Sequence, residues 1–107
     1  MDRLQFPESD WKLLRKRLPG WQSAYMEKLI GEYKSLLDED IPASTRFWAL
    51  DERIRKDRTT TGVIAEMKRS NMLFIISDLL SDGAITEEDL NCFSEELKEA
   101  AIRISRR

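Results

Sequence analysis

The sequence has no histidine and a single cysteine, Cys92, among its 107 residues. Histidine is the usual general base and, with cysteine, the usual zinc ligand, so most nucleophilic and zinc chemistry is excluded. There is no glycine-rich phosphate loop, and no carboxylate pair interrupts an apolar face at a convincing spacing. One cysteine also excludes an internal disulfide and fits a reducing compartment. We predict that the chain is not an enzyme and uses no metal or other cofactor.

Long apolar runs are also missing. A membrane-spanning helix needs roughly 20 mostly apolar residues, whereas the most apolar stretch here is interrupted by Lys68, Arg69, Asn71 and Asp78. The first seven residues lack the apolar core of a signal peptide. We therefore expect a cytoplasmic protein that neither spans nor is anchored to a membrane.

The residues that are abundant indicate a helical domain. The chain is 41% hydrophobic and 36% charged, with only four glycines and three prolines, which lie between periodic segments. At this length we expect one domain covering residues 1–107. The predicted fold is all-α: an antiparallel bundle of four main helices with short loops, preceded by a short N-terminal helix.

Hydrophobic periodicity and capping residues place the expected helices. The short first helix begins near Ser9 or Asp10 and is broken by Pro19-Gly20. The last helix begins after Thr86, with a turn at Gly83 in the left-handed conformation before it. Between them, helices are expected over residues 21–37, 44–58 and 62–80.

The expected helix over residues 62–80 is apolar on nearly every side, which is typical of a buried central helix. Glu66, Ser70 and Ser77 form its predicted solvent strip. Asn71 and Asp78 are seven residues apart, so they lie on the same side of the expected helix, with apolar side chains on both sides of them. We treat them as a candidate internal polar pair. A buried polar group needs a hydrogen-bond partner.

Three interpretations of the Asn71–Asp78 pair remain open. The partner could be intramolecular, for instance Tyr25 or Tyr33. The pair could also line a small polar pocket, or it could fix the register across a subunit interface.

Excess apolar surface favours a protein-protein interaction or regulatory module that acts as a homodimer. The apolar residues of segment 21–37 cover about half of a helical wheel, more than one neighbouring helix requires. Trp48 lies off the apolar stripe of its own helix, and the last helix has a short heptad-like seam. The candidate interface residues are Trp21, Tyr25, Tyr33, Trp48, Leu97 and Ile104.

A nucleic-acid-binding regulator is the alternative. The net charge is −2, but residues 46–69 hold seven bases and four acids, whereas residues 78–99 hold eight acids and one base. Basic segments 12–17 and 53–69 could contact phosphates, with residues 62–69 as part of a helix-turn-helix unit. The candidate phosphate contacts are Lys12, Arg15, Lys16, Arg55, Lys56, Arg58, Lys68 and Arg69.

The segment Asp78–Asp89 resembles a degenerate EF-hand calcium loop. Leu80 stands where the loop needs an oxygen ligand, and Asp89 stands where a bidentate glutamate is usual. We interpret this segment as an ordinary connection between two helices.

Three segments, Trp11–Gln22, Phe47–Leu50 and Gly62–Met67, resemble a group of short bacterial proteins with no assigned function. The resemblance covers most of the chain, and it implies no activity and no site residues.

Overall fold

A computed structural model of the chain describes residues 6–107, and every regular element in that range is helical. The α-helices are α1 (Glu8–Leu37), α2 (Ala43–Asp57), α3 (Met72–Ser81) and α4 (Glu95–Ser105). Two short 3₁₀ helices, η1 (Arg69–Asn71) and η2 (Glu87–Leu90), precede α3 and α4. The all-α prediction is confirmed. None of the helices in residues 6–107 is long and apolar enough to cross a membrane.

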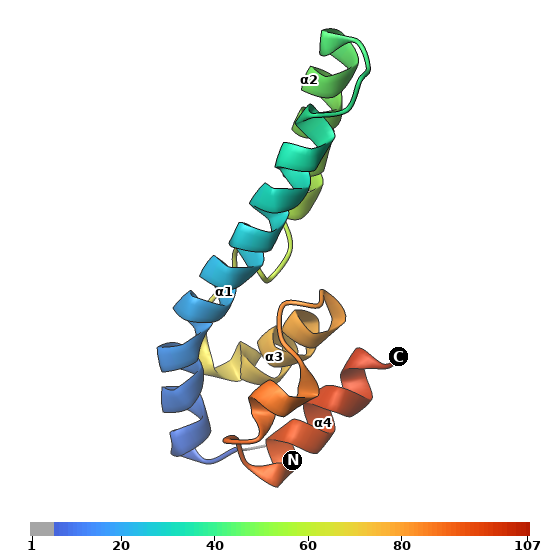
Figure 1. Cartoon of the computed structure of the whole chain (residues 1–107). Helices are drawn as coiled ribbons and strands as arrows, with labels where there is room; N and C mark the ends of the chain where they lie inside the picture. Colours follow the sequence, from blue (N-terminus) through green and yellow to red (C-terminus); the bar gives the residue numbers. More distant parts are fainter. Residues whose placement is uncertain (1–5) are drawn as a thin grey trace.

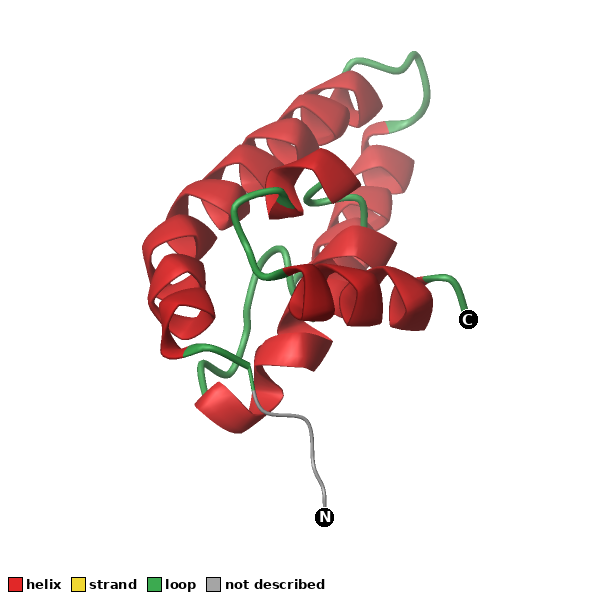
Figure 2. Cartoon of the chain, turned by 90° about the horizontal axis from the view of Figure 1, so that it is seen from below, coloured by secondary structure: helices red, strands yellow, loops and turns green. Residues whose placement is uncertain are grey.

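The molecule consists of two parts (Figure 1). Residues 8–18 of α1 and residues 69–105 form a globular part, the base, and residues 21–57 of α1 and α2 form an antiparallel hairpin that projects from it. The principal extents are 56 × 24 × 22 Å and the radius of gyration is 16.5 Å, against roughly 13 Å for a compact chain of this length. The expected antiparallel four-helix bundle is not confirmed, because α3 and α4 lie at the foot of the hairpin. Figure 2 shows the base in front of the receding hairpin.

The predicted break at Pro19-Gly20 is wrong, because α1 continues through Pro19 for 30 residues. There is accordingly no separate short N-terminal helix among the described residues. Proline removes one hydrogen bond of the helix and crowds the preceding turn, but Pro19 is exposed, so water can reach the freed carbonyl group. Leu18 in the base and Trp21 against Phe93 hold the helix on both sides of the proline. Figure 1 shows the helix axis changing direction within its blue N-terminal part.

The central helix was also predicted too long. Helix α3 begins at Met72, and residues 61–68 form turns and extended chain. Thr59–Thr61 and Gly62 lie at and just before the start of this segment, and β-branched residues and glycine are poor helix formers. Thr60 closes the turn by accepting from the N–H groups of Val63 and Ile64 at 3.0 and 2.9 Å.

The predicted solvent strip of that helix is consequently wrong. Glu66 and Ser70 precede α3, and Ser77 is buried, where its hydroxyl donates to the Leu73 carbonyl at 2.9 Å. Phe74, in contrast, is exposed on α3.

The core lies in the base. Leu14 of α1, Ile76 and Leu79 of α3, Leu90 of η2 and Leu97 of α4 are completely buried there. Because they come from four different elements, these side chains hold together segments that are far apart in sequence.

Hydrogen bonds at the ends of two helices reinforce the base. Asp10 is buried and accepts from both the N–H group and the hydroxyl of Ser94, whose own hydroxyl oxygen caps α4 by accepting from Leu97 N–H. Thr86 caps η2, not the last α-helix as expected, and shares a capping box with Asp89. Gly83 has φ 77°, which confirms the predicted left-handed turn.

Candidate interaction surface

The two helices of the hairpin are joined by a short acidic loop. Residues 38–42 connect α1 to α2, and Arg46 closes this connection by donating to the carbonyl groups of Leu37 and Ile41 at 2.9 and 3.1 Å. The carbonyl groups at the end of a helix lack partners within the helix. Arg46 therefore satisfies the end of α1 and fixes the direction of α2.

A polar network joins α1 to α2. The Tyr33 hydroxyl donates to the buried carboxylate of Asp57 at 2.6 Å. Arg53 pairs with Glu32 at 2.6 Å and with Asp57 at 3.4 Å, and its guanidinium lies 5.6 Å from the Tyr33 ring centroid. Burial, together with the hydrogen bond to the Asp57 carboxylate, raises the pKa of Tyr33 to about 12. These polar contacts join the two helices of the hairpin, in which Leu29 is the only buried apolar residue.

Each helix of the hairpin carries a stripe of apolar side chains, and we call the face with these two stripes the open face. On α1 its residues Met26, Ile30, Tyr33 and Leu37 are spaced 4, 3 and 4, and on α2 Phe47, Leu50 and Ile54 are spaced 3 and 4. Such spacing aligns side chains along one side of a helix. Five of the seven are exposed: Met26 (37%), Ile30 (44%), Leu37 (38%), Phe47 (62%) and Ile54 (42%).

A groove shows that both stripes belong to the same face. A cavity of about 220 Å³ lies between the helices, with Met26, Ile30 and Tyr33 on one side and Ile54 and Arg58 on the other. Phe47 and Leu37 continue the two stripes toward the hairpin loop. The open face is thus an apolar furrow with the same spacing as a helix-bundle seam.

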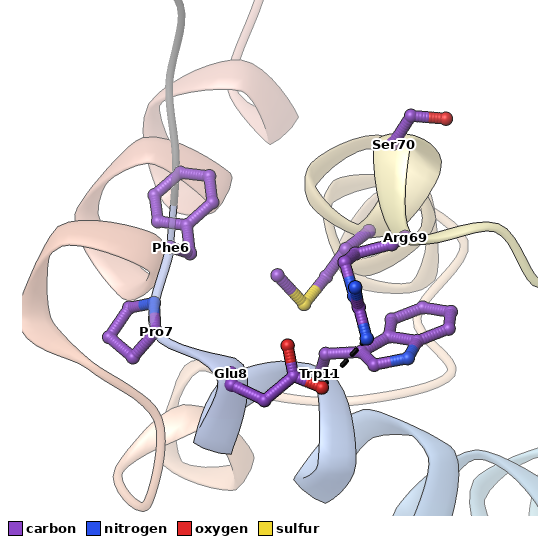
Figure 3. A pocket seen from close by; sticks show the side chains of 7 residues that line it. Phe6, Pro7, Glu8, Trp11, Arg69 and Ser70 are labelled. Atoms are coloured by element: carbon purple, nitrogen blue, oxygen red, sulfur yellow. Dashed lines mark hydrogen bonds and ion pairs between the residues drawn. The ribbon is translucent and has the colours of Figure 1, made fainter.

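A larger cavity of about 450 Å³ lies on the base, between the start of α1 and η1 (Figure 3). Its apolar wall includes Phe6, Trp11 and Met72. Arg69 reaches across it to pair with Glu8 at 2.7 Å, with its guanidinium 5.8 Å from the Trp11 ring centroid. Because the charges of Arg69 and Glu8 already neutralise each other, this cavity offers no isolated charge to a ligand.

The structure does not bring the six predicted interface residues together. Leu97 is completely buried in the base and is unavailable to a partner, and Ile104 is half-buried on the same helix. Trp21 packs against Phe93 with ring centroids 6.1 Å apart. Leu97 is part of the core of the base, and Ile104 and Trp21, the first residue of the hairpin, pack against that core.

The other three predicted residues lie on the hairpin. Tyr33 belongs to the open face, whereas Tyr25 is half-buried against Gly62. Trp48 is 62% exposed and lies edge-on to Phe47 at 4.9 Å, to the side of the open face. Sequence reasoning missed Met26, Ile30, Leu37, Phe47 and Ile54 as interface candidates, although their spacing and the broad apolar arc of segment 21–37 were visible.

Asn71 and Asp78 are not an internal pair. Asn71 is half-buried at the start of α3, where its side-chain amide donates to the Glu66 carbonyl at 3.4 Å. Asp78 is exposed on α3. The prediction assumed one helix over residues 62–80, in which both side chains would lie on the same buried side. Because α3 begins only at Met72, that assumption is wrong.

The predicted phosphate contacts lie in three places. Lys12, Arg15 and Lys16 are exposed on α1 in the base, and Arg55, Lys56 and Arg58 are exposed at the end of α2. Lys68 and Arg69 pair with Glu66 and Glu8, at 2.8 and 2.7 Å. Residues 62–69 are not the helical part of a helix-turn-helix unit, because no α-helix covers them.

The segment Asp78–Asp89 connects α3 to η2. Asp82 accepts from the Thr61 N–H group at 3.2 Å, and Asp89 accepts from the Thr86 N–H group at 2.8 Å. Burial raises the pKa of Asp82, and the Thr61 hydrogen bond opposes that change. Within residues 6–107, no group of three or more acidic or cysteine side chains is placed to hold a metal ion.

No protein-family model matches the chain, and the searches of curated proteins and of solved structures also found no match.

Proposed function

We propose that this chain is a protein-protein interaction or regulatory module that acts as a homodimer through the open face of its hairpin. The observation that carries the proposal is the exposure of five large apolar side chains along one face of two paired helices. Large contiguous apolar patches on soluble proteins mark interaction sites, because their hydration is unfavourable.

The form of the surface supports a helical partner. Two rows of side chains, spaced 4, 3 and 4 on α1 and 3 and 4 on α2, present the knobs and holes that another pair of helices can fill. A second hairpin of the same kind would complete a four-helix arrangement and cover both rows. Self-association requires only that the open face be self-complementary about a twofold axis.

Sedimentation equilibrium over a range of concentrations tests this proposal. Wild type should be dimeric, and Ile30→Glu, which places a charge in the middle of the open face, should be monomeric. Phe74→Glu is the matched control, because Phe74 is 58% exposed on α3, away from the hairpin. This control should leave the dimer intact. A wild-type chain that stays monomeric at high concentration would overturn the proposal.

Nucleic-acid binding is the second candidate. It is favoured by the exposure of Lys12, Arg15 and Lys16 within two turns of α1. Binding through phosphates should weaken as salt rises. Retention of duplex DNA at low salt that is lost in a Lys12→Gln, Arg15→Gln, Lys16→Gln variant supports this function, and no retention at low salt excludes it.

A further inference from the structure

The two ends of the hairpin carry opposite charge. At the loop end, Asp38, Glu39 and Asp40 are all exposed, and we call them the acidic tip. At the other end of α2, Arg55, Lys56 and Arg58 are all exposed, with Arg55 paired to Asp51 at 2.9 Å, and we call these three residues the basic foot. The basic foot suits the dipole of α2, whose C-terminus favours positive charge, whereas the acidic tip lies between the C-terminus of α1, which disfavours negative charge, and the N-terminus of α2, which favours it.

These charges border the open face. Arg58 lines the groove at the foot, four residues after Ile54 of the α2 stripe. Asp38 follows Leu37 directly, at the end of the α1 stripe. The apolar furrow therefore runs from a negative end to a positive end.

The two helices have nearly equal lengths within the hairpin. Helix α2 has 15 residues, or about 22 Å, and residues 21–37 of α1 cover about 26 Å at the usual rise per residue. A second hairpin laid over the open face in the opposite direction would thus place each tip beside the other foot.

We infer that the partner on the open face is a second copy of this chain whose hairpin lies antiparallel, with the acidic tip of each copy against the basic foot of the other. This inference rests on the proposed function and specifies its geometry. A twofold axis makes the tip-to-foot contact twice, and both contacts join opposite charges. A parallel pair would place tip against tip and foot against foot, and both contacts would be repulsive.

Site-specific cross-linking tests the direction directly. Cys92 is the only cysteine and is exposed, so Cys92→Ser provides the background. Glu39→Cys places a thiol at the tip and Lys56→Cys places one at the foot. A short bismaleimide should cross-link a mixture of the tip and foot variants, and it should not cross-link the tip variant to itself.

The outcomes separate the two proposals. A dimer by sedimentation that cross-links tip to tip overturns the antiparallel geometry but leaves the homodimer standing. A dimer that gives no tip-to-foot product also overturns the geometry. A monomeric wild-type chain overturns the proposed function and the geometry together.

Charge reversal gives an independent measurement. Replacing Asp38, Glu39 and Asp40 by lysine should raise the dimer dissociation constant about tenfold or more at low salt, because both contacts become repulsive. Adding Lys56→Glu and Arg58→Glu to the same chain should restore the dimer. A parallel dimer would be unaffected by tip reversal, since two positive tips repel as two negative tips do. Circular dichroism should show unchanged helix content in each variant.

Discussion

The base and the hairpin use their apolar residues in opposite ways. In the base, leucine and isoleucine side chains from α1, α3, η2 and α4 are completely buried. In the hairpin, residues 21–57, only Leu29 and Asp57 are buried, while the apolar stripes stay exposed. Both parts are built from helices, so the difference in apolar burial comes from the number of helix layers. The base packs helices on several sides of α3, whereas the hairpin has a single layer with two helices.

This difference shows that a single layer of two helices needs other contacts to stabilise it, because it buries little apolar surface. A helix in water is only marginally stable, and most of its stability in proteins comes from packing an apolar face. The hairpin compensates with Tyr33, Asp57, Arg53 and Glu32, and with Arg46 at the loop. These contacts fix how α1 and α2 pair, but they do not cover the apolar stripes. The relative position of the two helices is thus fixed, while the apolar side chains of the open face remain exposed.

Matched leucine substitutions should give the largest effect and the sharpest contrast. Leu79→Ala in the base removes a completely buried side chain and should reduce the free energy of unfolding by about 2–5 kcal/mol. Leu37→Ala, on the exposed end of the α1 stripe, should reduce it by less than about 1 kcal/mol. Urea denaturation should be followed at a concentration where the chain is monomeric. Equal losses would mean that the hairpin has a core of its own.

The joint between the two parts should be the next most sensitive place. Gly62 is buried, and a Cβ added to it would lie 2.3 Å from Cδ2 and 2.7 Å from Cγ of Tyr25. Because rotation about χ2 leaves Cγ in place, Tyr25 must change its χ1 rotamer or the backbone must shift, and Gly62→Ala should cost about 1–3 kcal/mol. The neighbouring Thr61 carbonyl accepts from Gln22 at 3.0 Å, so the displaced segment would also strain its link to α1.

A double-mutant cycle identifies the cause. If the collision with the ring dominates, adding Ala at position 62 to a Tyr25→Ala chain should cost much less than in wild type. Gly20→Ala is a control, since nothing lies within 4 Å of a Cβ built there. An equal cost of Gly62→Ala in both backgrounds would rule out the ring as the obstacle.

The sequence predicted where helices occur better than it predicted the residues at which they begin and end. The predicted range 44–58 differs from α2 by one residue at each boundary, because the apolar stripe of Phe47, Leu50 and Ile54 marks most of the helix, although Ser44 lies inside the helix and Pro42 precedes it. The prediction failed at Pro19, where contacts of Leu18 and Trp21 with the base outweigh the cost of proline inside a helix. It failed again over residues 62–71, where apolar residues suggested a helix but local propensity and the Gly62–Tyr25 contact favour a turn.

The candidate surface was predictable in outline only. The broad apolar arc of segment 21–37 indicated that some side chains would remain uncovered, and the structure places that excess on the open face. Which apolar residues stay uncovered depends on how α2 pairs with α1, and that pairing is fixed by contacts between residues 24 positions apart, such as Tyr33 and Asp57. Leu97 shows the opposite error. Its heptad-like spacing suggested an exposed interface seam, but the side chain is completely buried in the core.

The smallest expected effect concerns the polar network that stands in for a hairpin core. Tyr33→Phe removes the hydrogen bond to Asp57 but keeps the ring, and it should cost about 0.5–1.5 kcal/mol at neutral pH. The Asp57 carboxylate keeps its contact with Arg53 at 3.4 Å, so the loss should remain modest. Phe47→Leu, on the exposed stripe, is the control and should change the free energy of unfolding very little when the chain is monomeric.

The pH dependence separates the hydrogen bond from the ring. The folded-state pKa of Tyr33 is about 12, above the value of about 10 for an unfolded chain. A raised pKa means that the folded protein holds the phenol proton more tightly. The contribution of Tyr33 is therefore fully present below pH about 10 and is lost as the pH rises toward 12. Wild type should lose more stability than Tyr33→Phe over that interval, measured by urea denaturation at each pH. Parallel losses would mean that Asp57 is held by Arg53 alone, within α2, and the Arg53–Glu32 pair would then be the main polar side-chain contact between the middles of the two helices.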